Sequence, residues 1–304
     1  MVEDSPHGFS SLLSGELADR VRRLELFSRF RVEGLLSGTG KSPFKGFTAD
    51  FLQHRQYFPG DPLKHLDWRV YGKSERLFIR EYEELTNTRL TVVLDVSGSM
   101  SHTGASWSKH EFAIRAAAIV TYLAMAQRDS FSLALFREGR AGHVPFGGGR
   151  QHLRRVFAAL LDTPPRDGTD FSRGLAEATS TVRHRGLTMV FSDFMDDPEA
   201  VVRRLAQLRY RGHDVIAAQV HDPSEQELDF NSVTRFHDPE GPTVLVVDPQ
   251  LIQRQYRLAF ETHLAALKGA CHRHGFEFIA LPVGDAFEVP VFTYLQRRLE
   301  RFTR

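Results

Sequence analysis

The chain has 304 residues, and its 39 lysines and arginines nearly balance its 38 aspartates and glutamates, for a net charge of +1. This balance gives no global electrostatic reason to expect nucleic acid or an anionic membrane as a partner. A single cysteine, Cys271, excludes an internal disulfide framework and a cysteine zinc cluster, and it favours the reducing cytosol. No apolar run approaches the roughly 20 residues of a membrane helix, and the N-terminus lacks a basic-then-apolar signal pattern. We therefore expect a soluble, cytoplasmic globular protein.

The first 87 residues are expected to form a smaller N-terminal α+β extension. Apolar side chains recur every three or four positions between residues 12 and 30, which is the spacing of one helical face. Arg23 and Glu25 fall among the polar positions of this helix, whose mixed charge favours packing on the protein itself over lying on a membrane surface. Residues 77–83 alternate apolar and polar side chains, so we expect a strand there, paired with part of 43–58.

From Leu90 onward, apolar runs typical of buried strands alternate with segments of helical spacing. The glycine-rich stretch 139–149 is expected to be a mobile loop. This alternation predicts an α/β fold for residues 88–304, a doubly wound, mostly parallel sheet with helices on both faces. Strands are expected at 90–95, 130–136, 187–191, 214–220 and 277–282, with an edge strand at 243–247, and helices at 110–128, 150–161, 171–183, 198–211, 249–274 and 291–301.

One carboxylate and two hydroxyls follow the first of these predicted strands, in the sequence Asp95-Val96-Ser97-Gly98-Ser99. Asp95 falls at the carboxyl end of the strand, where open α/β sheets place their ligand crevices. A cluster of oxygen atoms with little charge suits a hard divalent cation, Mg²⁺ in particular, which needs only one or two protein carboxylates. The alternative is that Asp95 and Ser97 simply cap the following turn.

Two further residues are expected at the same edge of the sheet. Thr169 precedes the helix at 171–183, and Asp193 follows the strand at 187–191. The carboxyl ends of parallel strands meet at one edge, so residues distant in sequence can face a single point there. The candidate metal ligands are Asp95, Ser97, Ser99, Thr169 and Asp193.

With these five positions matched in identity and order, residues 88–285 resemble von Willebrand factor A domains and their metal-ion-dependent adhesion site. The resemblance implies that Ser97, Ser99 and Thr169 ligate Mg²⁺ directly or nearly so, with Mn²⁺ or Ca²⁺ as substitutes. It implies that Asp95 and Asp193 act partly through water. The remaining coordination position would accept a carboxylate from a partner protein, which gains a strong contact because the hydroxyl ligands leave the ion underneutralised.

A metal-dependent phosphohydrolase is the alternative function. Aspartyl-phosphate phosphatases also place a nucleophilic aspartate at a strand end beside Mg²⁺, but they need a second carboxylate two residues later as general acid. Ser97 occupies that place, and a hydroxyl with an ordinary proton affinity cannot do this work near neutral pH. We therefore expect a protein without enzymatic activity.

Three segments upstream of Asp95 carry a second resemblance: Arg55 to Pro62, His65 to Arg69 and Leu77 to Glu83. Ahead of the Asp-x-Ser-x-Ser motif, they resemble the family catalogued as domain of unknown function 58. That family is commonly linked to MoxR-type AAA+ ATPases. The resemblance implies a protein-interaction module that serves such an ATPase, or the substrate of that ATPase, as adaptor or co-chaperone.

Overall fold

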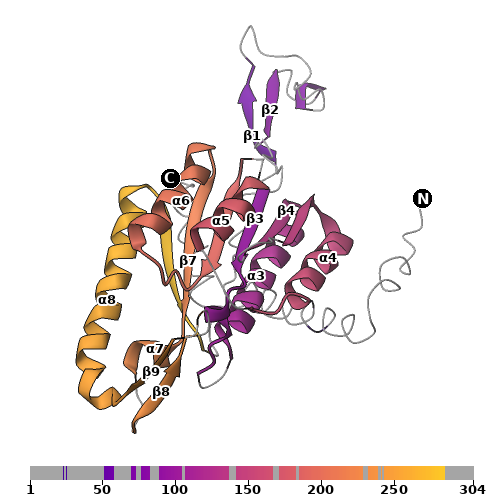
Figure 1. Cartoon of the computed structure of the whole chain (residues 1–304). Helices are drawn as coiled ribbons and strands as arrows, with labels where there is room; N and C mark the ends of the chain where they lie inside the picture. The colour runs from indigo at the N-terminus through magenta and orange to yellow at the C-terminus, as the bar shows by residue number, and fades with distance from the viewer. Residues whose placement is uncertain are drawn as a thin grey trace.

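Figure 1 shows the computed structural model of the chain. Only Arg23 and Glu25 of the helix predicted at 12–30 belong to the part that the structure describes, and both are helical. The helix predicted at 291–301 lies outside it. The described residues are 23, 25, 51–57, 70–72, 77–82, 89–104, 107–136, 142–166, 171–182, 185–228, 232–238, 241 and 243–284.

A six-stranded sheet forms the centre of the described part, in the order β10-β7-β6-β3-β4-β5. Its strands are β3 (Arg89–Asp95), β4 (Ser130–Phe136), β5 (Gly142–Gly147), β6 (Leu187–Ser192), β7 (Asp214–His221) and β10 (Glu277–Pro282). Every neighbouring pair is parallel except β4 and β5. Numbered along the chain, the six strands lie in the order 3-2-1-4-5-6, which is that of a doubly wound fold. The predicted fold class is confirmed.

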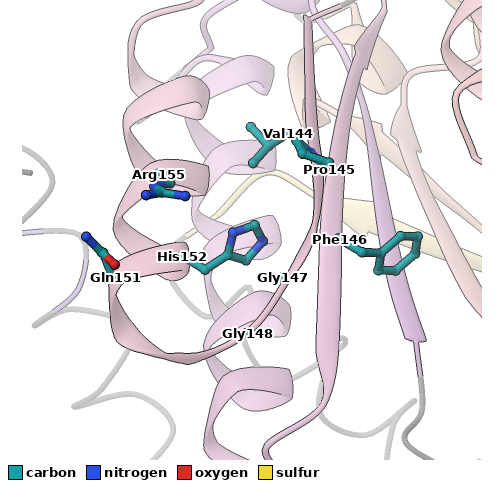
Figure 2. A pocket seen from close by; sticks show the side chains of 8 residues that line it. All are labelled: Val144, Pro145, Phe146, Gly147, Gly148, Gln151, His152 and Arg155. Atoms are coloured by element: carbon teal, nitrogen blue, oxygen red, sulfur yellow. The ribbon is translucent and has the colours of Figure 1, made fainter. Parts of the chain in front are cut away.

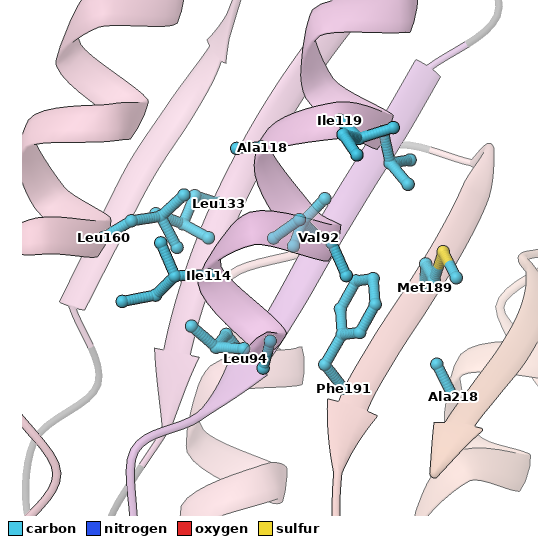
Figure 3. Close-up of a cluster of buried hydrophobic side chains, with 14 of the residues drawn as sticks. Val92, Leu94, Ile114, Ala118, Ile119, Leu133, Leu160, Met189, Phe191 and Ala218 are labelled. Atoms are coloured by element: carbon cyan, nitrogen blue, oxygen red, sulfur yellow. The ribbon is translucent and has the colours of Figure 1, made fainter. Parts of the chain in front are cut away.

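Helices cover both faces of this sheet (Figure 1). Residues alternate across β3, so Val92 and Leu94 pack under α3 and α4, whereas Val93 packs under α5, α6 and α8. Figure 3 shows the first of these cores, where Ile114 and Ile119 of α3 lie over β3. The helices are α3 (Lys109–Ala126), α4 (Gly149–Leu161), α5 (Phe171–Ser180), α6 (Pro198–Tyr210) and α8 (Pro249–Arg273). Because both faces are covered, the central strands are apolar on both sides.

The structure corrects two of the expectations from sequence. The stretch 139–149 is not a loop throughout, because Gly142–Gly147 forms β5 and pairs with β4, whose edge would otherwise leave backbone groups unpaired. Val244–Val247 is a strand, β9, but it pairs with β8 (Thr234–His237) in a separate two-stranded ribbon. The far edge of the main sheet is β10.

A second two-stranded sheet joins β1 (Phe51–Gln56) and β2 (Phe78–Tyr82) in antiparallel register. This pairing confirms the strand expected at 77–83 and its partner within 43–58. The division of the chain at residues 87 and 88 stays a prediction. In the described ranges, none of the helices combines the length and the apolar character needed to cross a membrane.

Candidate functional site

Asp95 ends β3 at the switch point of the sheet, where the strand order reverses between β3 and β6. Its side chain is buried, and both carboxylate oxygens accept hydrogen bonds. Oδ1 accepts from the backbone N–H of Ser97 (2.9 Å), and Oδ2 accepts from the Ser192 hydroxyl at the end of β6 (2.6 Å). The first bond is the local turn contact of the capping alternative, but the second joins two neighbouring strands. Asp95 is therefore fixed by the sheet as well as by its own turn.

The two serines of the motif face each other. Ser97 Oγ lies 3.0 Å from Ser99 Oγ, at the start of a short 3-10 helix, η3 (Gly98–Ser101). Ser97 precedes η3 in extended conformation, and its side chain makes no capping hydrogen bond to that helix. The two hydroxyls are thus presented together beside Asp95, which the capping alternative alone does not require.

Asp193 reaches the same edge from β6. Its Oδ2 accepts a hydrogen bond from Lys109 Nζ (2.8 Å), and Oδ1 accepts from the backbone N–H of Met195 (3.4 Å). Phe194, between them, has a φ of +51°, a left-handed conformation that is uncommon for a bulky residue. This turn allows the Phe194 N–H to donate to the Ser192 hydroxyl (3.0 Å). Backbone strain of this kind persists only where surrounding contacts hold it.

The pKa of Asp95 is raised from 3.8 to about 7, first by burial and second by the negative charge of Asp193, and hydrogen bonds from Ser192 and Ser97 oppose this shift. Two buried carboxylates that repel each other make the ionised state of Asp95 costly. A cation placed between them would remove that cost.

The donor atoms of the described candidates are all oxygens, from two carboxylates and two hydroxyls. This set fits a hard cation such as Mg²⁺ and does not suit zinc, which prefers nitrogen and sulfur ligands. Among the residues that the structure describes, no group of three or more histidines, cysteines, aspartates or glutamates is arranged to hold a metal. Thr169 lies in 167–170, outside the described residues. The structure brings Asp95, Ser97, Ser99 and Asp193 to one edge, and their ligation of a metal stays a prediction.

Three residues of this site were not predicted from the sequence: Lys109, Ser192 and Glu225. Lys109 is the first residue of α3 and is 1% exposed. Its ammonium lies between Asp193 and Glu225, at 2.8 and 2.6 Å. The sequence could have indicated Lys109, because a lysine in the first turn of a helix is repelled by the helix dipole and is stable there only with a carboxylate nearby. Ser192 directly precedes Asp193, but nothing in the sequence distinguishes it from a core serine.

Glu225 lies on α7 (Pro223–Glu227), a short helix that follows β7. Asp222 caps α7 by accepting from the backbone N–H of Ser224 (2.8 Å), and its other oxygen accepts from the N–H of Gly104 (3.1 Å). A Cβ atom at Gly104 would lie 2.2 Å from Asp222 Oδ1, so only glycine allows this approach. The loop after η3 is therefore tied to the helix that carries Glu225.

A pocket of about 260 Å³ lies elsewhere, between β5 and the start of α4 (Figure 2). Its wall includes His152 and Arg155 but no carboxylate. His152 Nε2 lies 2.9 Å from the carbonyl oxygen of Phe131, a contact that packs α4 against β4. None of the described residues of the candidate site lines this pocket.

The family described as "Protein of unknown function DUF58" matches residues 53–269, so the chain belongs to this family. This confirms the family expected from the upstream segments. The order of the sheet, with Asp95 at the end of its first strand, agrees with the resemblance to von Willebrand factor A domains.

Two relatives are uncharacterized proteins, Rv1480 of Mycobacterium tuberculosis and Mb1516 of Mycobacterium bovis. Each is 27% identical to this chain over 251 residues, which is 79% of this chain and 78% of the relative. Among solved structures, an aerotolerance-related membrane protein from Bacteroides fragilis has 14% identity and a TM-score of 0.48, covering 70% of this chain and 99% of that one. The conserved hypothetical protein BatB from Bacteroides thetaiotaomicron has 15% identity and a TM-score of 0.45, with the same coverage.

Proposed function

We propose that this protein is a non-enzymatic, Mg²⁺-dependent protein-interaction module that binds an acidic side chain of a partner at the carboxyl edge of its sheet. The observation that carries the proposal is the placement of Asp95, Ser97, Ser99 and Asp193 at the switch point between β3 and β6. Ligands bind at this point in open α/β sheets.

Each residue has a defined part in this proposal. Ser97 and Ser99, with Thr169, would hold the ion through neutral hydroxyls. Asp95 would balance its charge while the Ser97 N–H and the Ser192 hydroxyl keep the carboxylate in place. Asp193 would supply the second carboxylate. The bound ion supplies an electrophilic position that an external carboxylate can occupy.

The partner we propose is a MoxR-type AAA+ ATPase, or the substrate of that ATPase, which this protein would serve as adaptor or co-chaperone in the cytoplasm. Membership of the family supports this choice, together with a site suited to an acidic side chain. A role without catalysis is supported at the residue level. The place of a phosphatase general acid is taken by Ser97, whose hydroxyl contacts that of Ser99.

Capture experiments test the proposal. The full chain is immobilised, and a purified MoxR-type AAA+ ATPase is offered in Mg²⁺ buffer and in EDTA. We expect capture in Mg²⁺ only, and loss of capture by Ser99→Ala. Ser101→Ala is the matched control, because Ser101 lies on the same 3-10 helix and its hydroxyl donates to the carbonyl of Gly98 (2.6 Å). Capture that persists in EDTA would refute the bridging carboxylate.

The same proteins separate this role from a phosphohydrolase. The full chain is incubated with a generic phosphate monoester in Mg²⁺, beside Asp95→Asn. We expect no turnover by either protein. Turnover by the wild type that disappears in Asp95→Asn would make the enzyme the better description.

A further inference from the structure

A lysine ammonium is buried at the wall of the candidate metal site. Lys109 Nζ donates to Asp193 Oδ2 at 2.8 Å and to Glu225 Oε1 at 2.6 Å, and its side chain is 1% exposed. Asp193 is itself almost fully buried, and Glu225 is partly buried. An ammonium removed from water at this depth persists only where carboxylates compensate for its lost hydration.

The position of Lys109 opposes local helix electrostatics. It is the first residue of α3, where the helix dipole repels a cation, and the preceding Ser108 already caps the helix through Glu111. Helix formation therefore gives no reason for a lysine here. The ammonium is stabilised instead by two carboxylates, Asp193 directly after β6 and Glu225 on α7.

The two carboxylates of the candidate site, Lys109 and Glu225 have a simple sum of charges. Asp222, which lies beside Glu225, is not counted because it is held by Ser224 and Gly104 and is the same in every variant below. Asp95, Asp193 and Glu225 carry three negative charges when ionised, and Lys109 carries one positive charge. The remaining two negative charges equal the charge that a divalent ion neutralises. Glu225 has a further tie, because its second oxygen accepts from the backbone N–H of Asp222 (3.0 Å) and stays on α7.

We propose that Lys109 and Glu225 form a built-in charge pair that sets the affinity of the metal site: the ammonium competes with a divalent cation for Asp193, and Glu225 draws it away when the cation binds. This inference rests on the proposed function, since it concerns the same metal. Removing the ammonium should tighten metal binding, and removing the Glu225 charge should weaken it. Two neighbouring residues thus have effects of opposite sign.

The test measures binding of Mn²⁺ and Mg²⁺ to the full chain by titration calorimetry. Lys109→Met leaves three negative charges and should bind at least about tenfold more tightly, because the change removes the Coulomb repulsion between the ammonium and an ion a few ångströms away. Glu225→Gln leaves one negative charge and should bind the divalent ion about tenfold more weakly. The double variant restores two negative charges and should bind with close to wild-type affinity.

Glu227→Gln is the matched control, because Glu227 undergoes the same charge change on the same short helix and is exposed. It should bind metal like the wild type. If Lys109→Met fails to fold, the comparison of Glu225→Gln with Glu227→Gln decides: weaker binding only in Glu225→Gln supports the pair, and equal binding overturns it.

Loss of binding in Asp95→Ala, together with unchanged affinity in Lys109→Met and Glu225→Gln, would overturn the charge pair and leave the metal site standing. Absence of metal binding by every variant, Lys109→Met included, would overturn both.

Discussion

Replacing Asp95 with asparagine isolates the electrostatic cost of the candidate site. The carboxylate is buried, and its pKa in the folded protein is about 7 against an ordinary value of 3.8. Asparagine has nearly the same shape, can still accept from the Ser97 N–H, and carries no charge. The Ser192 hydroxyl can turn to accept from its amide. The change should therefore remove the cost of ionising Asp95 and little else.

The sign of the pH effect follows from the raised pKa. Folded Asp95 holds its proton up to about pH 7, whereas the unfolded chain loses it near pH 4, so protonation favours the folded state between these limits. That contribution disappears as pH rises through the folded pKa. From about pH 5 up to the folded pKa, the free energy of unfolding falls by about 1.4 kcal/mol per pH unit. The total loss between about pH 5 and pH 8 is therefore about 3 kcal/mol.

Urea unfolding in EDTA, followed by circular dichroism, measures this difference. We expect Asp95→Asn to be about 4 kcal/mol more stable than the wild type at about pH 8, and this advantage to shrink by about 3 kcal/mol at about pH 5. Histidines titrate in both proteins, so the difference between them reports Asp95. The reasoning is refuted if Asp95→Asn is the less stable protein at about pH 8, or if the difference does not change with pH.

Three further predictions concern contacts around the site and on α4. Ser192→Ala removes the hydroxyl that donates to Asp95, so it should cost about 1 to 2 kcal/mol in chemical unfolding and weaken Mn²⁺ binding; unchanged stability and binding would contradict this role. Gly104→Ala forces Asp222 away from α7 and should cost about 1 to 3 kcal/mol in the same assay; unchanged stability would contradict the close approach. Burial raises the pKa of Glu25, but the charges and hydrogen bonds of Arg150 and Arg154 outweigh burial and hold it below 4.5. Its stabilisation is present above the unfolded pKa and is lost in acid, so Glu25→Gln should cost about 1 kcal/mol near neutral pH and nothing in acid.

The fold was predictable because strands and helices of this domain carry strong local patterns. Strands β4 and β10 begin and end at the predicted residues, and β3 and β6 differ from prediction by one residue. The meeting of Asp95 and Asp193 follows from parallel strand geometry, which the sequence pattern already indicates. Local periodicity and sheet geometry were sufficient for these features.

The remaining features depend on contacts between distant segments. Strand β5 is stabilised by pairing with the edge of β4, and the glycine-rich sequence of β5 gives no local sign of this pairing. Lys109 finds its two carboxylates 84 and 116 residues away, and Ser192 finds Asp95 across 97 residues. Glu25 belongs to the expected polar side of its helix, yet it is buried against two arginines of α4. Periodicity separates polar from apolar faces and does not say which polar groups will be paired.

Titration of Mg²⁺ into the purified full chain tests the central claim most directly. We expect the wild type and Ser101→Ala to bind one ion with the same affinity. We expect the double variant Ser97→Ala, Ser99→Ala to bind none, while its unfolding curve in EDTA stays close to that of the wild type. Equal binding of Mg²⁺ by the wild type and the double variant, or no binding by the wild type, would contradict it.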